Sequence, residues 1–101
     1  MKKILFLLYL TSSLCHAADQ QAARQDELRQ LMKNDCGACH GLTRQGGMGP
    51  ALLPATLASK SDDVLIETIL NGRKGTAMPP WKFMLNHDDV AWIVQQLRIV
   101  P

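Results

Sequence analysis

The sequence predicts an all-α domain with long irregular loops, and two observations lead to that fold class. Three segments of the 101-residue chain place apolar side chains at helical spacing, and loops rich in Gly, Pro and Met separate them. Neither loop shows the alternation of polar and apolar residues that is typical of a strand. Since loops of this length in a compact domain usually have a function, we expect them to wrap a bound group.

The first element of the chain is a short apolar segment. Lys2 and Lys3 precede an uninterrupted apolar run over residues 4–10, and the small residues around Ala17 offer a cleavage site. This pattern is typical of a secretory signal peptide. We therefore expect residues 1–17 to be a signal peptide that is cleaved after Ala17 or Ala18, and the chain to be exported to the periplasm.

The remaining chain, residues 18–101, is expected to form a single domain. The apolar run before it is shorter than the about 20 residues of a bilayer span, so we expect no permanent anchor. A retained signal anchor is the alternative. Without Lys2 and Lys3 the eleven basic residues fall to nine, equal to the nine acidic ones, so no charge excess favours nucleic acid. We expect a monomer whose small core depends on a bound group.

The first two predicted helices have clear apolar faces or end signals. The first covers residues 23–35, and one face carries Leu28, Leu31 and Met32. The second follows Ser61, a favourable N-cap, and has acids at residues 62–63 in its first turn. Gly72 ends it. The acids stabilise the positive end of the helix dipole, so we expect no catalytic role for them.

The third predicted helix opens at Asn86. Acidic residues 88–89 lie in its first turn, as at the start of the second helix. Its apolar stripe consists of Val90, Ile93, Val94 and Leu97. The stripe predicts that this helix packs its length against the core.

The pentapeptide Cys36-Gly37-Ala38-Cys39-His40 contains the residues that indicate a bound cofactor. Cys-x-x-Cys-His is the attachment signature of c-type haem: two thiols bond the two vinyl groups of one porphyrin, and the histidine offers its imidazole to the iron. A thioredoxin-like redox pair would need strands, and a zinc site would need two further clustered ligands. We therefore predict one covalently bound haem c, held by Cys36 and Cys39, with His40 as an iron ligand.

The sixth ligand of the iron decides between a carrier and a ligand-binding protein. The candidates are Met48, Met78, Met84 and His87. Met48 follows His40 too closely to reach the opposite face of the ring. Met78 is favoured, because Pro79-Pro80 stiffen the loop that presents it, and Met84 is the second choice.

Three segments, taken in order, resemble the small single-haem class I cytochromes c. They are Cys36 to Gly41, Gly49-Pro50-Ala51-Leu52 and Gly75 to Trp81. The segments from Asn34 to Thr43 and from Met78 to Trp81 are, more narrowly, similar to c55X-type cytochromes. That resemblance implies a redox partner in denitrification, either cytochrome cd1 nitrite reductase or an oxidoreductase that matures its d1 haem.

The resemblance also implies details of the fold and site. Three core helices would surround the haem, and Leu28 and Met32 would cross Trp92 and Ile93. The carbonyl of Pro50 would accept a hydrogen bond from the imidazole of His40. Trp81 would lie near the haem propionates, although a core aromatic is an alternative. Attachment would require the c-type cytochrome maturation machinery.

These features together predict a one-electron carrier and no enzyme. The alternatives are an electron donor to another periplasmic or membrane oxidoreductase, an open-site haem enzyme or gas sensor, and a haem-bearing assembly protein. Five basic residues and no acid occupy the two loop segments expected to frame the haem: Arg44, Lys60, Arg73, Lys74 and Lys82. They predict either docking of an acidic partner or neutralisation of the propionates.

Overall fold

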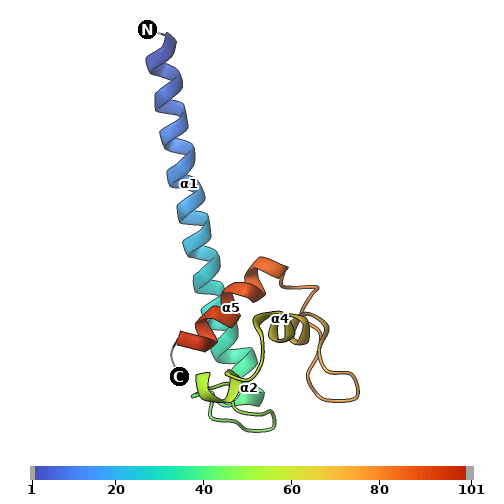
Figure 1. Cartoon of the computed structure of the whole chain (residues 1–101). Coiled ribbons are helices and arrows are strands. Elements are labelled where there is room, and N and C mark those ends of the chain that lie inside the picture. The colour runs from blue at the N-terminus through green and yellow to red at the C-terminus, as the bar shows by residue number, and fades with distance from the viewer. Residues whose placement is uncertain (1, 100–101) are drawn as a thin grey trace. The chain divides into compact units, whose positions relative to one another are not determined.

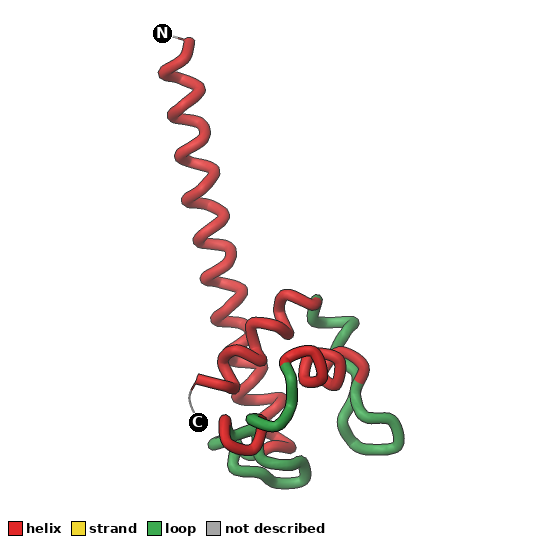
Figure 2. Tube along the Cα trace, viewed as in Figure 1, coloured by secondary structure: helices red, strands yellow, loops and turns green. Residues whose placement is uncertain are grey.

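The computed structural model describes residues 2–99, with side chains from residue 14 onward. The chain divides into two compact units, Met1–Gln30 and Leu31–Pro101. Within the described residues every regular element is a helix (Figures 1 and 2). The predicted all-α fold class is thus confirmed.

Helix α1 spans Lys2–Leu31 and starts far before the predicted first helix. It has no break at residue 17, so the expected cleavage site lies within a continuous helix and the domain boundary stays a prediction. No helix within residues 2–99 is long and apolar enough to cross a membrane. The exposed pairs Arg24–Glu27 and Arg29–Asp26 lie one turn apart on α1 and contribute little to stability.

The predicted first helix was expected to end at Asp35, but the helical backbone continues beyond this residue. A π-helical turn, η1 (Met32–Cys36), leads directly into the short helix α2 (Gly37–His40). Gly41, at a φ of 91°, ends the run. Gly37 lies within this run at a helical φ of −63°, so the backbone continues its turns through the pentapeptide.

Helix α4 (Asp62–Asn71) begins and ends as predicted, and α5 (His87–Ile99) begins as predicted. The hydroxyl of Ser61 accepts a hydrogen bond from the Val64 amide at 3.3 Å. At the start of α5, the side chains of Asn86 and Asp89 each accept a bond from the other's amide, at 2.8 and 3.1 Å. Such reciprocal caps satisfy amides that a helix start leaves unpaired.

A short helix that the sequence did not indicate, α3 (Pro54–Leu57), lies in the first loop, with Pro54 at its start. Both α3 and α4 contact α5. The core of the second unit consists of Leu57, Leu65, Ile66, Leu85, Val90, Ile93, Val94 and Leu97. The expected crossing of Leu28 and Met32 with the last helix joins residues of both units and stays a prediction.

Arg98 holds these three helices together from the C-terminal end of α5. Its guanidinium donates to the Asp62 carboxylate at 2.6 Å and to the carbonyls of Leu57 and Lys60, at 3.2 and 2.6 Å. Gln95 donates to the same carboxylate at 3.0 Å. The clamp ties the segment between α3 and α4 to the last helix.

Candidate cofactor site

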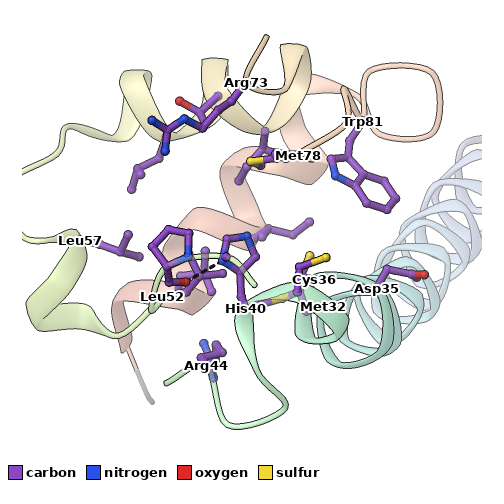
Figure 3. Close-up of a pocket in the computed structure, with 18 of the residues that line it drawn as sticks. Met32, Asp35, Cys36, His40, Arg44, Leu52, Leu57, Arg73, Met78 and Trp81 are labelled. Carbon is purple, nitrogen blue, oxygen red and sulfur yellow. Dashed lines mark hydrogen bonds between the residues drawn. The ribbon is translucent and has the colours of Figure 1, made fainter. Parts of the chain in front are cut away.

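The second unit contains a cavity of about 710 Å³. Its walls are mostly apolar, and its size falls within the roughly 300–1,000 Å³ of small-molecule and cofactor sites. The cavity is lined by all four predicted site residues, Cys36, Cys39, His40 and Met78 (Figure 3). Residues far apart in the sequence thus meet around one space that a flat cofactor can fill.

Local helical geometry places the three pentapeptide side chains on one face. Cys36 ends η1, and Cys39 and His40 lie in α2, three and four residues further along. Residues at these spacings in a helix lie on the same side. The two thiols and the imidazole therefore point to the same wall of the cavity.

The imidazole of His40 is oriented by a backbone carbonyl. Its Nδ1 lies 2.7 Å from the carbonyl oxygen of Pro50. Because a carbonyl can only accept, Nδ1 carries the proton, and Nε2 is left with its lone pair for a metal. The structure thus contains the hydrogen bond that the resemblance to class I cytochromes implied.

The loop that carries Pro50 closes tightly under the imidazole. The amide of Gly46 donates to the carbonyl of His40 at 2.8 Å, and the amide of Gly49 donates to the carbonyl of Cys39 at 2.8 Å. A Cβ at Gly49 would lie 2.8 Å from Nδ1 of His40. Only glycine allows the backbone to approach the ring so closely.

The loop from residue 72 to residue 81 presents Met78 from the other side of the cavity (Figure 3). The amide of Arg73 donates to the carbonyl of Met78 at 3.2 Å, and the Met78 amide donates to the Thr76 hydroxyl at 3.3 Å. At the end of the loop, the Trp81 amide bonds the last turn of α4. Internal and terminal hydrogen bonds therefore hold the thioether in place.

These side chains fit a c-type haem. Two thiols and an imidazole share one wall, a thioether faces them, and a buried nitrogen of Arg44 that lacks a hydrogen-bond partner also belongs to the lining. Residues 23–96 match the family described as cytochrome C oxidase, cbb3-type, subunit III.

The chain belongs to the cytochrome c family. Its relatives include the cytochrome c55X of Paracoccus denitrificans (strain Pd 1222), 44% identical over 97 residues that cover 96% of this chain and 94% of the relative. The cytochrome c55X of Pseudomonas aeruginosa is 50% identical over 76 residues, covering 75% of this chain and 64% of that protein. A covalently bound haem c is the cofactor of this family.

Two solved structures resemble the cytochrome. The c-type cytochrome NirC matches with a TM-score of 0.76 and 48% identity, over 79% of this chain and 98% of NirC. Dihydro-heme d1 dehydrogenase NirN in complex with DHE matches with a TM-score of 0.67 and 36% identity, over 72% of this chain and 16% of NirN. The fold is therefore that of the class I cytochromes c.

The other candidates for the sixth ligand are less well placed in the cytochrome. Met48 lines the cavity but belongs to the same loop as Pro50, on the His40 side, and its side chain is 80% exposed. Met84 and His87 are exposed and do not belong to the described lining. Of the four candidates, the arrangement favours Met78.

The surroundings of Cys36 raise the pKa of its thiol. Burial, together with the nearby carboxylate of Asp35, raises its pKa from 9.0 to about 11. The sulfur is therefore a protonated thiol at neutral pH until it is bonded.

The structure divides the five basic residues of the loops into two groups. Arg44, Lys60 and Arg73 belong to the lining of the cavity, whereas Lys74 and Lys82 lie outside the described lining; of the five, only Arg44 is half-buried and the other four are exposed. The sequence placed all five near the haem but could not distinguish inward from outward side chains, because both loops lack a regular period.

Trp81 also lines the cavity. In Figure 3 it lies above Cys36 and Asp35, on the side away from Arg44 and Arg73. Its expected place beside the propionates stays a prediction.

Proposed function

We propose that this chain is a periplasmic one-electron carrier with a single haem c, bonded to Cys36 and Cys39. His40 and Met78 are its axial ligands. The observation that supports the proposal is that an imidazole and a thioether lie on opposite sides of one cavity. The imidazole, at the end of α2, is oriented by the carbonyl of Pro50, and the thioether lies on a loop closed by hydrogen bonds.

The bound haem supplies an iron that changes between Fe(II) and Fe(III), and a thioether ligand favours the reduced state. The chain's own residues hold the coordination constant. Pro50 keeps the proton of His40 on Nδ1, and the loop of residues 72–81 keeps Met78 in position. If His40 and Met78 both held the iron, no iron site would be left for a substrate, which favours electron transfer over catalysis.

The Met78→Ala variant tests this assignment. We expect the oxidised protein to lose its thioether-to-iron absorption band and the reduced protein to bind CO rapidly. Met84→Ala is the matched control, because Met84 lies outside the described lining, and it should leave both properties unchanged. If the unsubstituted protein binds CO as fast as the Met78 variant, an open-site sensor or enzyme replaces the carrier.

Export is part of the proposal. The basic start at Lys2 and Lys3, the apolar run and the small residues near Ala17 support a cleaved signal peptide. The mass of the protein purified from the periplasm should equal that of a chain beginning at Ala18 or Asp19 plus one haem. A mass that includes residues 1–17 would indicate a retained anchor, and a second haem mass would overturn the single-haem assignment.

The partner is proposed from the named relatives. Dihydro-heme d1 dehydrogenase contains a segment similar to this chain, in only 12% of its length. Removing two hydrogens from a dihydro-haem releases two electrons and two protons, so two molecules of a one-electron carrier would be reduced. We propose such an enzyme, or nitrite reductase, as the partner within denitrification.

Stopped-flow kinetics with either enzyme tests this partner. We expect the rate of haem reduction or oxidation to fall as salt increases, and to fall further when Lys74 and Lys82 are changed to Gln, because charge pairs steer encounter. No transfer to either enzyme would leave another periplasmic oxidoreductase as the partner. An unchanged salt dependence in the double variant would exclude docking through these lysines.

A further inference from the structure

The segment of residues 56–60, at the end of α3, contributes to the wall of the cavity. Thr56, Leu57 and Lys60 belong to the lining, and the side chain of Leu57 is buried. In Figure 3, Leu57 lies on one side of the imidazole of His40 and Cys36 lies on the other. A flat group that is bonded at Cys36 and spans the cavity would therefore meet the 56–60 wall with its opposite edge.

Local structure alone holds the 56–60 wall weakly. Helix α3 has only four residues, and so short a helix is not stable by itself in water. Two backbone hydrogen bonds close the segment: the Leu57 amide donates to the Leu53 carbonyl at 3.1 Å, and the Lys60 amide donates to the Leu57 carbonyl at 3.0 Å. The wall therefore depends on contacts with other elements for its position.

Arg98 supplies such contacts from α5. Its Nη1 and Nη2 atoms donate to the carbonyls of Leu57 and Lys60, which belong to the wall, at 3.2 and 2.6 Å. Its Nε atom donates at 2.6 Å to the carboxylate of Asp62, in the first turn of α4. Because a guanidinium is planar and holds its donors in fixed directions, these bonds give the wall one position relative to α4 and α5.

The same end of α5 also reaches the cavity directly. Leu97, the residue before Arg98, is buried and belongs to the lining, as does Ile93 one turn earlier. Arg98 itself lies outside the described lining. It would therefore act on a bound group only through the carbonyls that it holds, and the carboxylate of Asp62 balances its charge.

We propose that Arg98 positions the 56–60 wall against the bound haem and thereby sets the reduction potential of the iron. The inference rests on the proposed function, in which the ring is bonded at Cys36 and Cys39. Burial is one of the properties through which a protein sets the potential of a haem. Water stabilises the oxidised ring, which carries one more positive charge than the reduced ring, so a displaced wall lowers the potential.

The midpoint potential of the Arg98→Lys holoprotein tests this role. The variant keeps the positive charge, but a single ammonium group cannot span three separate acceptors. We expect the ratio of oxidised to reduced protein at a fixed potential to rise about threefold, which lowers the potential by about 28 mV for a one-electron couple. An unchanged potential would overturn the positioning role, because the charge alone would then suffice.

Val90→Ala is the matched control. Val90 is fully buried in the same helix, lies outside the described lining and supplies no side chain to the clamp of Arg98. Its truncation should lower the stability but leave the potential near that of the unsubstituted protein. Equal shifts of the potential in the two variants would reflect a general loosening of the fold and would overturn the inference.

The methyl signals of Leu57 in the NMR spectrum of the reduced holoprotein report the wall directly. A porphyrin displaces the signals of nearby methyl groups from their usual positions through its ring current. In Arg98→Lys these signals should move toward the usual position of leucine, and in Val90→Ala they should not. Unmoved signals in Arg98→Lys would contradict a displaced wall.

A second variant covers the case in which Arg98→Lys does not fold. Asp62→Ala removes the anchor of the guanidinium on α4, and it should move the same Leu57 signals in the same direction. If these signals stay in place, the clamp does not position the wall.

Failure of the proposed function would be recognised separately from the absorption spectrum. If the oxidised, unsubstituted protein lacks the thioether-to-iron band, the carrier assignment is contradicted, while the Leu57 signals still report the wall. A normal band together with an unmoved potential and unmoved Leu57 signals in Arg98→Lys contradicts the positioning role alone.

Discussion

At Gly49 the absence of a side chain lets the backbone pass beneath the imidazole of His40. A methyl group there would lie 2.8 Å from Nδ1 and 2.9 Å from Cε1. The ring could escape only by leaving the carbonyl of Pro50. The lack of a methyl group at Gly49 therefore allows His40 to keep its bond to Pro50, and with it the tautomer that carries the proton on Nδ1.

We expect Gly49→Ala to destabilise the holoprotein by about 2 kcal/mol, as overpacking typically does. The melting temperature should fall by about 10 °C for a domain of this size. Thermal melting followed by the haem absorption measures the change.

Gly37→Ala is the control for this substitution. Its Cβ would meet Leu42 at 3.4 Å, an ordinary contact, in helical backbone at a φ of −63°. That variant should melt close to the unsubstituted protein. If the two variants had the same melting temperature, the loop next to His40 would be shown to adjust to a methyl group without a loss of stability.

At the scale of elements, α5 organises the second unit because α3 and α4 both pack on it. The clamp of Arg98 is long-range in sequence, since its partners lie 36 to 41 residues earlier. Sequence reasoning treated Asp62 as a first-turn acid, which it is. Its second role as the partner of Arg98 depends on how the helices meet, and no local pattern indicates that.

Arg98→Ala should lower the stability by about 2 kcal/mol, because charge-assisted hydrogen bonds contribute about 1.5–3 kcal/mol and two carbonyls lose their donor. Urea denaturation followed by circular dichroism measures the loss. The control is Arg29→Ala, whose partner is the exposed Asp26 on the same helix. It should change stability by less than about 0.5 kcal/mol, and a loss as large as that of Arg98→Ala would contradict the clamp.

For the whole molecule, the cavity is the dominant energetic feature. Left unfilled, an apolar cavity of about 710 Å³ would deprive its lining side chains of packing partners, and such voids destabilise a core. The entire stability of a small domain is about 5–15 kcal/mol. The second unit is therefore not expected to keep this structure without a bound group.

Accordingly, the chain with Cys36→Ala and Cys39→Ala, expressed without haem, should lack most of its native helix signal in circular dichroism. Met78→Ala keeps the attached haem and should retain that signal. A native-like, cooperatively melting spectrum from the haem-free double variant would contradict the claim that the cofactor completes the core.

Both bounds of α4 and the start of α5 followed from local chemistry, because Ser61, Gly72 and Asn86 act on the backbone close to them in the sequence. The start of α1 and the turns of η1 and α2 did not follow. The residues around these bounds carry no signal that ends a helix, and the change in composition near residue 17 does not interrupt one. Helix α3 was missed because four residues are too short to show a period.

The sequence by itself determined the helical class, the caps of the last two helices and the residues on which a haem site would depend, since these follow from spacing along the chain. The loop context favoured Met78 over Met84, and the resemblance implied the bond of Pro50 to His40, but only the tertiary structure brought these residues to one cavity. It alone decided that Arg44 belongs to the lining while Lys74 does not. Such choices depend on which loops close over the same space. Loops without a period carry no record of that in their sequence.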